Sequence, residues 1–317
     1  MRDSISPLIS IVIPTYNRAN LIGKAIQSIL DQSYGNWELI IVDNYSDDNT
    51  KEVIKAFNDD RILMLSTPRT GSVAASRNLG VAHSNGEWIA FLDSDDWWLP
   101  EKLMYVCKAL RNNPDLIYHD LQIVNANGAS MKQKRTKSRK LKEPIYLDLL
   151  LNGNDIALSS VVVRRAIFLG VKGMNESPTF FAVEDYDLWL RIAQITNRFV
   201  YISKELGVYR LHDGNIGRVN SFDYLSNALK GHLDLLNTYQ LRKYQSLYVY
   251  QIARANYLNR QFGNSASQFL FVIKFGKLQY RLKASLMLIT NLLCHFMVPK
   301  RSDFNSEKVV ADLLGPH

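Results

Sequence analysis

Three aspartates lie within four positions of one another in the segment Phe91-Leu92-Asp93-Ser94-Asp95-Asp96. They follow the apolar run Trp88–Leu92, which has the composition of a buried strand. Carboxylate oxygens are preferred ligands of Mg²⁺ and Mn²⁺, and these ions commonly share their coordination shell with phosphate oxygens. The same residues are also compatible with a turn that caps a helix starting near Glu101. The segment alone therefore leaves a metal site and a capped turn both open.

A second acidic segment begins at Glu184-Asp185. One carboxylate of such a pair can act as a general base, which takes the proton from a reacting hydroxyl. However, Val183 to Ala193 has helical periodicity, and the helix dipole favours acidic residues in a first turn. A purely structural role for the pair is therefore also open at this point.

A regular alternation of predicted strands and helices surrounds these acidic segments. Apolar runs predict strands at residues 8–13, 38–42, 62–65 and 88–92, and helical periodicity predicts helices at residues 21–31, 51–57 and 73–81. This alternation is typical of right-handed crossovers and a mostly parallel sheet. Three strands are followed by polar loops, which we expect to line one edge of that sheet: Thr15–Arg18, Asp43–Asp48 and Asp93–Asp96.

Ordered motifs across about residues 7–215 resemble those of the bacterial family 2 glycosyltransferases, which are inverting enzymes with the GT-A fold. The motifs are Ile-Val-Ile-Pro-Thr-Tyr-Asn-Arg, Glu-Leu-Ile-Ile-Val-Asp-Asn, Gly-Ser-Val-Ala-Ala-Ser-Arg-Asn-Leu-Gly, Phe-Leu-Asp-Ser-Asp-Asp, Glu-Asp-Tyr-Asp-Leu-Trp-Leu-Arg and Tyr-Arg-Leu-His. The resemblance implies an α/β, Rossmann-like fold with a mostly parallel central sheet flanked by helices. It also implies transfer of a sugar from a nucleotide diphosphate donor to an acceptor hydroxyl.

The resemblance assigns roles to the acidic residues. The departing nucleoside diphosphate needs its charge neutralised, and a divalent cation, Mn²⁺ or Mg²⁺, would do this. Asp95 is the expected metal ligand, with Asp93 nearer the ribose or sharing the ion. His212 resembles a histidine that reaches the metal or the diphosphate, and an ordinary loop histidine is its alternative. Asp185 is the expected general base and Glu184 the alternative, because two neighbouring carboxylates cannot both point into one site.

A nucleotide-sugar site is expected from the loops that follow the first two strands. Its expected residues, together with Asp93, are Pro14, Thr15, Tyr16, Arg18, Asp43, Asn44, Arg77 and Ser94. Arg77 could pair with the diphosphate through its planar guanidinium, or it could be a surface arginine on its helix. Most members of the family that the chain resembles carry two adjacent acids where this chain has Asp43-Asn44. An asparagine can both accept and donate a hydrogen bond, so the preference for uridine over another nucleoside stays open.

The length and composition of the chain are compatible with two structural units. The chain has 317 residues and 47% hydrophobic content, enough for a large core and a smaller unit. We expect a catalytic domain at residues 1–220, with a nucleotide half at about 1–125 and an acceptor half at about 145–220. Residues 221–317 are expected to form a basic helical extension. They carry 12 Lys or Arg against 5 Asp or Glu.

The extension is basic and apolar at once. Breaks at Gly263-Asn264 and Gly276 predict several helices. Its most apolar stretch, Ala284 to Val298, is shorter than the ~20 residues that cross a bilayer. We expect peripheral contact of residues 265–301 with an anionic membrane. The alternative is a helical hairpin with a solvated basic face.

Other features bear on partners and location. Cys107 and Cys294 are the only cysteines, and no apolar signal segment precedes the first strand, so we expect a cytoplasmic protein, peripheral on the inner face of the membrane. The basic run Lys132 to Lys142 predicts a mobile loop that either steers a phosphate-bearing acceptor or is simply solvated. No helix-turn-helix, RNP-like or zinc-finger pattern accompanies the basic charge, so a nucleic-acid partner is not expected.

Together these observations predict a metal-dependent inverting glycosyltransferase that uses a nucleotide sugar, expected to be a UDP-sugar. Its acceptor is expected to be a glycan or lipid-linked sugar in cell-surface polysaccharide or lipopolysaccharide assembly. Two other classes stay open. A nucleotidyltransferase would also use paired aspartates but would not need Glu184-Asp185, and a non-catalytic nucleotide-sugar binder would release no nucleoside diphosphate.

Overall fold

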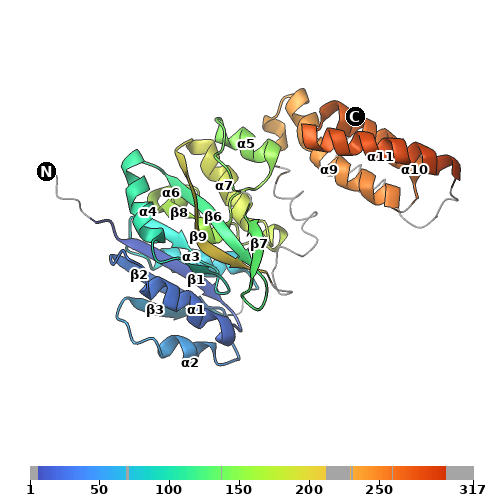
Figure 1. Cartoon of the computed structure of the whole chain (residues 1–317). Coiled ribbons are helices and arrows are strands. Elements are labelled where there is room, and N and C mark those ends of the chain that lie inside the picture. Colours follow the sequence, from blue (N-terminus) through green and yellow to red (C-terminus); the bar gives the residue numbers. More distant parts are fainter. Residues whose placement is uncertain are drawn as a thin grey trace. The chain divides into compact units, whose positions relative to one another are not determined.

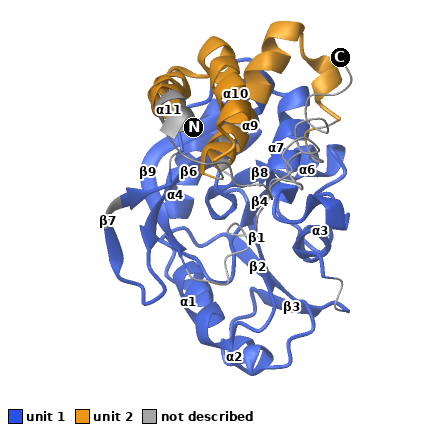
Figure 2. Ribbon diagram, turned by 90° about the vertical axis from the view of Figure 1, so that its right-hand side faces the viewer, with its two compact units in different colours: residues 1–228 blue, residues 229–317 orange. Residues whose placement is uncertain are grey.

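The computed structural model describes residues 6–68, 71–136, 138–211, 229, 231–258 and 260–297. The chain divides into two compact units, residues 1–228 and 229–317, which are coloured separately in Figure 2. The first unit contains all the strands described, and the second consists of helices (Figure 1).

A single mixed sheet forms the centre of the first unit. Its parallel part has the order β3-β2-β1-β4 and consists of β1 (Ile9–Thr15), β2 (Trp37–Asp43), β3 (Ile62–Ser66) and β4 (Trp88–Phe91). The sheet continues beyond β4 through strands of both directions: β8 (Val162–Arg164), β6 (Leu116–Val124), β9 (Phe199–Arg210) and β5 (Trp97–Trp98). The mostly parallel α/β fold predicted from the alternation is confirmed.

The helices of this unit follow the strands in the expected order. They are α1 (Ala19–Leu30), α2 (Thr50–Lys55), α3 (Val73–Ala82), α4 (Lys102–Ala109), α5 (Ile145–Asn152), α6 (Arg165–Gly170) and α7 (Glu184–Ile195). Short 3₁₀ turns are η1 (Leu110–Asn112), η2 (Leu158–Ser160) and η3 (Pro178–Phe180). The N-cap of α4 is Glu101, with no side-chain capping bond, and β5 separates it from the aspartates. The interpretation of Asp93–Asp96 as a helix-capping turn is therefore wrong.

Strand β1 packs helices on both of its faces. Ile11 and Ile13 lie in one core cluster with Ile22 and Ile26 of α1, because alternate side chains of a strand point to the same face. On the opposite face, Gly80 of α3 lies against Val12. A Cβ atom at position 80 would come within 2.5 Å of Val12 Cγ1, so only glycine allows this close approach. The last turn of α3 is thereby held against the middle of β1.

The basic run Lys132 to Lys142 begins with residues of a strand, which its composition did not predict. Its first part belongs to β7 (Ser130–Arg135), which pairs antiparallel with β6. Arg139 forms ion pairs with Asp148 and Asp155. The prediction of a loop is therefore wrong for residues 132–135, which belong to β7, because charged side chains are well tolerated on an edge strand with one solvated face.

The second unit contains α9 (Thr238–Leu258), α10 (Phe262–Phe275) and α11 (Leu278–Met297), preceded by the turn η5 (Leu233–Leu235). Its core includes Tyr250, Ala253, Phe269 and Ala284. The predicted break at Gly276 is confirmed, whereas Gly263 lies inside the first turn of α10 and does not break the helix. Within the described ranges, no helix combines the length and apolar character that crossing a membrane requires.

Candidate active site

A cavity of about 750 Å³ lies at the carboxyl ends of β1, β2 and β4, where ligands bind in open α/β sheets. The structure brings most of the predicted site residues to its wall: Pro14, Thr15, Tyr16, Arg18, Asn44, Arg77, Asp93, Ser94, Asp95, Glu184 and Asp185. These residues come from both halves of the first unit. Acidic groups that are distant in the sequence thus share one cavity.

Two predicted residues are not placed on this wall. Asp43 is fully buried and its carboxylate accepts hydrogen bonds from the backbone N–H (3.1 Å) and the hydroxyl of Ser46, while Lys51 lies 3.6 Å away. It shapes the loop after β2, and its neighbour Asn44 lines the cavity instead. His212 lies outside the described residues, so its metal role stays a prediction.

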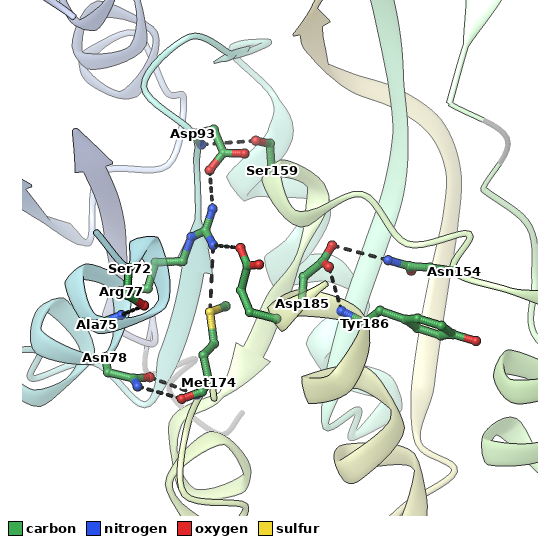
Figure 3. A network of polar contacts seen from close by, with 11 residues as sticks. Ser72, Ala75, Arg77, Asn78, Asp93, Asn154, Ser159, Met174, Asp185 and Tyr186 are labelled. Atoms are coloured by element: carbon green, nitrogen blue, oxygen red, sulfur yellow. Dashed lines mark hydrogen bonds and ion pairs between the residues drawn. The ribbon is translucent and has the colours of Figure 1, made fainter. Parts of the chain in front are cut away.

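Arg77 joins the two acidic segments (Figure 3). Its Nη2 donates to Asp93 Oδ1 at 2.7 Å, and its Nη1 donates to Glu184 Oε1 at 2.8 Å. Arg77 is only 4% exposed, so the interpretation as a surface arginine is wrong. Burial alone would lower the pKa of its guanidinium, but the two carboxylates raise it, so the side chain stays charged. Both terminal nitrogens are thus engaged by protein carboxylates, and a pairing of Arg77 with the diphosphate stays a prediction.

Asp185 has a different environment from Glu184. It is half-buried at the start of α7, where Oδ1 accepts from the N–H of Tyr186 (2.6 Å) and Oδ2 from Asn154 Nδ2 (3.3 Å; Figure 3). Burial, and then the neighbouring charge of Glu184, raises the pKa of Asp185 to about 7. A carboxylate with this pKa is a better proton acceptor near neutral pH than an ordinary aspartate. The environment therefore separates the two neighbouring acids into one paired with Arg77 and one suited to proton transfer.

The aspartates after β4 also differ from one another. Asp96 is buried, and its carboxylate accepts from the hydroxyl of Ser159 (2.6 Å) and the backbone N–H of Arg210 (3.0 Å). Burial and the charges of Asp95 and Asp93 raise the pKa of Asp96 well above its ordinary value. Asp93 and Asp95 are more exposed and lie on the cavity wall. All three aspartates line the cavity, and Asp96 is the buried one, held by Ser159 and the backbone of Arg210.

A divalent cation fits this donor set when a ligand completes it. Within the described ranges, no three His, Cys, Asp or Glu side chains lie close enough to hold a metal ion by themselves. Asp93 and Asp95 supply hard oxygen donors at the cavity wall. Mg²⁺ and Mn²⁺ are commonly held by one or two carboxylates together with substrate phosphates. The cavity therefore suits a cation that arrives with a diphosphate.

Sequence reasoning missed several residues that shape the site. Asn78 donates to the backbone carbonyl of Met174 through Nδ2 (2.8 Å) and accepts from the N–H of Met174 through Oδ1 (2.9 Å; Figure 3). Its Nδ2 also donates to Glu176 Oε1 at 2.8 Å. The Ser159 hydroxyl accepts from the backbone N–H of Asp93 (3.1 Å) and donates to the carboxylate of Asp96. The signal for Asn78 was its place beside Arg77 in the Ser-Arg-Asn-Leu-Gly motif. No local pattern marked Ser159.

The comparison with known families identifies the chain. The sequence pattern of the family described as Glycosyl transferase family 2 matches residues 10–170. The chain belongs to this family. The match covers the parallel part of the sheet, the aspartates after β4 and Arg77. The resemblance predicted from the motifs is therefore confirmed, and the protein is a family 2 glycosyltransferase.

Similar proteins include a curated bacterial relative and two solved structures. UDP-Glc:alpha-D-GlcNAc-diphosphoundecaprenol beta-1,3-glucosyltransferase WfgD of Escherichia coli is 36% identical over 192 residues, which are 60% of this chain and 71% of that protein. TarS 1-349 of S. aureus in complex with UDP-GlcNAc has a TM-score of 0.60 and 16% identity, covering 89% of this chain and 88% of that one.

A second solved structure, the mannosyltransferase PcManGT from Pyrobaculum calidifontis in complex with GDP-Man and Mn²⁺, has a TM-score of 0.57 and 15% identity, covering 93% of this chain and 88% of that one. At these identities the two structures show the fold alone, and the expected GT-A fold is confirmed.

Proposed function

We propose that this family 2 glycosyltransferase moves a sugar from a UDP-sugar to a hydroxyl of a lipid-linked sugar diphosphate, with inversion and with a divalent cation. The convergence of Asp93, Asp95 and Asp185 on one cavity carries the proposal. Two carboxylates next to the diphosphate and one beside the acceptor hydroxyl are what a single displacement at the anomeric carbon requires.

The nucleoside end of the donor is assigned to the loops after β1 and β2. Thr15 Oγ1 is buried there without a hydrogen-bond partner among the described residues, although Thr15 lines the cavity. A buried polar group of this kind is commonly satisfied by a ligand or water. Asn44 and Arg18 lie on the same wall. The Asn44 side-chain oxygen can accept the imide N–H of uracil, and the WfgD name specifies a UDP-sugar, so we assign uridine as the base.

The reaction follows from the placement of Asp185. The acceptor hydroxyl gives its proton to the Asp185 carboxylate as its oxygen bonds to the anomeric carbon. The bond between that carbon and the diphosphate breaks on the opposite face, and UDP leaves with the electron pair. A bound Mg²⁺ or Mn²⁺ would supply the positive charge that stabilises this leaving group, with Asp95 and Asp93 as its protein ligands. Glu184 is paired with Arg77, which leaves Asp185 as the proton acceptor.

Two observations support the assignment of the acceptor: the acceptor named for the relative WfgD, and the positive charge near the cavity in this chain. The WfgD name specifies a GlcNAc attached through a diphosphate to undecaprenol. In this chain Thr136 lines the cavity and directly follows Lys134 and Arg135, which are exposed at the end of β7. Exposed cations at the cavity mouth would attract the diphosphate of such an acceptor. The expected role in cell-surface polysaccharide assembly follows from this acceptor class.

The test is a turnover assay with UDP-sugars and a short-chain polyprenyl diphosphate-linked GlcNAc. We expect UDP release with Mn²⁺ or Mg²⁺, a disaccharide product with inverted anomeric configuration, and no product with Asp185→Ala. Release of pyrophosphate would instead identify a nucleotidyltransferase. Donor binding without UDP release for any acceptor would identify a non-catalytic binder.

A further inference from the structure

Helix α11 has two apolar faces, and only one of them is packed. Ala284 is buried against α9 and α10, with Tyr280, Met287 and Leu288 packed around it. Asn291 belongs to the same face, and its amide donates to the carbonyl of Phe262 at 2.8 Å. These contacts identify the side of α11 that packs against α9 and α10.

The opposite side of α11 carries a row of bare aliphatic side chains. Leu278, Leu282, Leu286 and Ile289 are 70%, 66%, 66% and 59% exposed. Their spacing of four, four and three residues places them on one face of the helix. The row extends for about 16 Å along the axis at 1.5 Å per residue. We call these four residues the α11 stripe.

Basic side chains flank the α11 stripe on both sides. From the 100° turn per residue, Arg281 and Lys283 lie about 100° to either side of the middle of the stripe, and both are exposed. Within the described part of the second unit, Asp234 is the one acidic residue, and it precedes α9. An apolar row with cations at its margins matches a membrane surface, with acyl chains below a layer of anionic headgroups.

Helix α10 lacks these features. Its exposed positions are Gly263, Asn264, Ser267, Leu270 and Lys274, which form a mainly polar surface. The expected membrane contact of residues 265–301 therefore narrows to one face of α11. We infer that the α11 stripe docks the protein on an anionic bilayer, with the helix lying in the plane of the interface. This inference concerns attachment and is separate from the assignment of donor and acceptor.

The test is sedimentation of the full chain with vesicles of phosphatidylcholine alone or mixed with phosphatidylglycerol. We expect sedimentation with the mixed vesicles, weakened by added salt, and at least tenfold weaker partitioning for Leu282→Glu/Leu286→Glu. Arg281→Glu/Lys283→Glu should remove the preference for phosphatidylglycerol. Leu169→Glu and Lys55→Glu are the matched controls, because these residues are exposed on the first unit, and they should sediment like the wild type.

Two results would overturn the inference. One is sedimentation of Leu282→Glu/Leu286→Glu equal to that of the wild type, with circular dichroism showing an intact fold in both. The other is a wild-type dimer in solution that this variant dissociates, while vesicle binding is unchanged. That second outcome would assign the α11 stripe to a second copy of the chain. Turnover on a water-soluble acceptor analogue reports separately on the proposed reaction, so the two proposals can fail independently.

Discussion

Arg77 and Glu184 are 107 positions apart in the sequence, yet a 2.8 Å hydrogen bond joins Nη1 of the arginine to Oε1 of the glutamate. Since Nη2 of the same side chain holds Asp93, one buried cation connects the end of β4 to the start of α7. The donor end and the base end of the cavity are therefore fixed relative to each other by a single guanidinium.

Replacing Arg77 with Met should destabilise the fold strongly. Removing one partner of a buried ion pair leaves uncompensated charge and typically costs about 3–5 kcal/mol. Chemical denaturation should show a loss of this order, together with loss of turnover. Arg61→Met is the matched control, because Arg61 pairs with Asp59 at the surface, where an ion pair contributes about 0–1 kcal/mol. Equal losses for the two variants would contradict the role assigned to Arg77.

Asp185→Asn should abolish turnover without weakening the fold. The folded-state pKa of about 7 lies above the ordinary value of 3.8, so the folded protein binds a proton that the unfolded chain has lost. Stability therefore falls as pH rises from about 4 to 7, and a neutral amide avoids this loss. We expect a kcat at least ~100-fold lower. We also expect Tm above that of the wild type at pH 8 and equal to it near pH 4. A lower Tm at pH 8 would show that Asp185 is a structural acid.

The pH dependence of turnover should report the proton on Asp185. Since the base must be deprotonated, kcat/KM should rise with pH through about 7 and then level off. Glu184→Gln removes a negative charge that raises this pKa, so the acid limb should move to lower pH. A pH–rate profile of both proteins measures the shift. If the acid limb of the pH–rate profile lies at the same pH in both proteins, a group other than Asp185 controls the rate.

Turnover should depend on a divalent cation, and Asp95 should determine how tightly that cation binds. Chelation with EDTA should remove turnover, and added Mn²⁺ or Mg²⁺ should restore it. Asp95→Asn should raise the cation concentration for half-maximal activity by ~10-fold or more, since a neutral amide is a weaker ligand for a hard cation. Asp47→Asn serves as the control, because Asp47 is exposed and outside the cavity wall. Full activity in EDTA would refute the assigned cofactor.

Local patterns predicted the elements of the sheet well. The apolar run from Leu8 and the helical periodicity from Leu21 identify β1 and α1 to within about two residues, because burial on a strand and on one helix face imposes different periods. Motif order then placed Asp95 and Asp185 in one site, and the cavity wall includes both.

The partners of Arg77 could not be predicted in the same way. Hydrogen bonds to Asp93 and Glu184 depend on the three-dimensional approach of α3 to α7, which no spacing in the sequence encodes. The order in β7 was missed for a related reason. This charged edge strand is stabilised by its pairing with β6 and by the ion pair of Arg135 with Asp120, and not by apolar periodicity of its own.

The three hydrogen bonds of Asn78 have a practical consequence for engineering. They seat the turn at Met174 on α3, and a Cβ at Gly173 would come within 2.6 Å of Asn78 Oδ1. Consider a chimera in which the residues after position 145 come from another family member. Its turn at position 174 then comes from a protein with a different α3, so it does not match the α3 of this chain. Such a chimera should fold correctly only when the segment Ser76–Gly80 is taken from the same protein as the second half. If Ser76–Gly80 is left unchanged, we expect α7 of the second half to be misplaced.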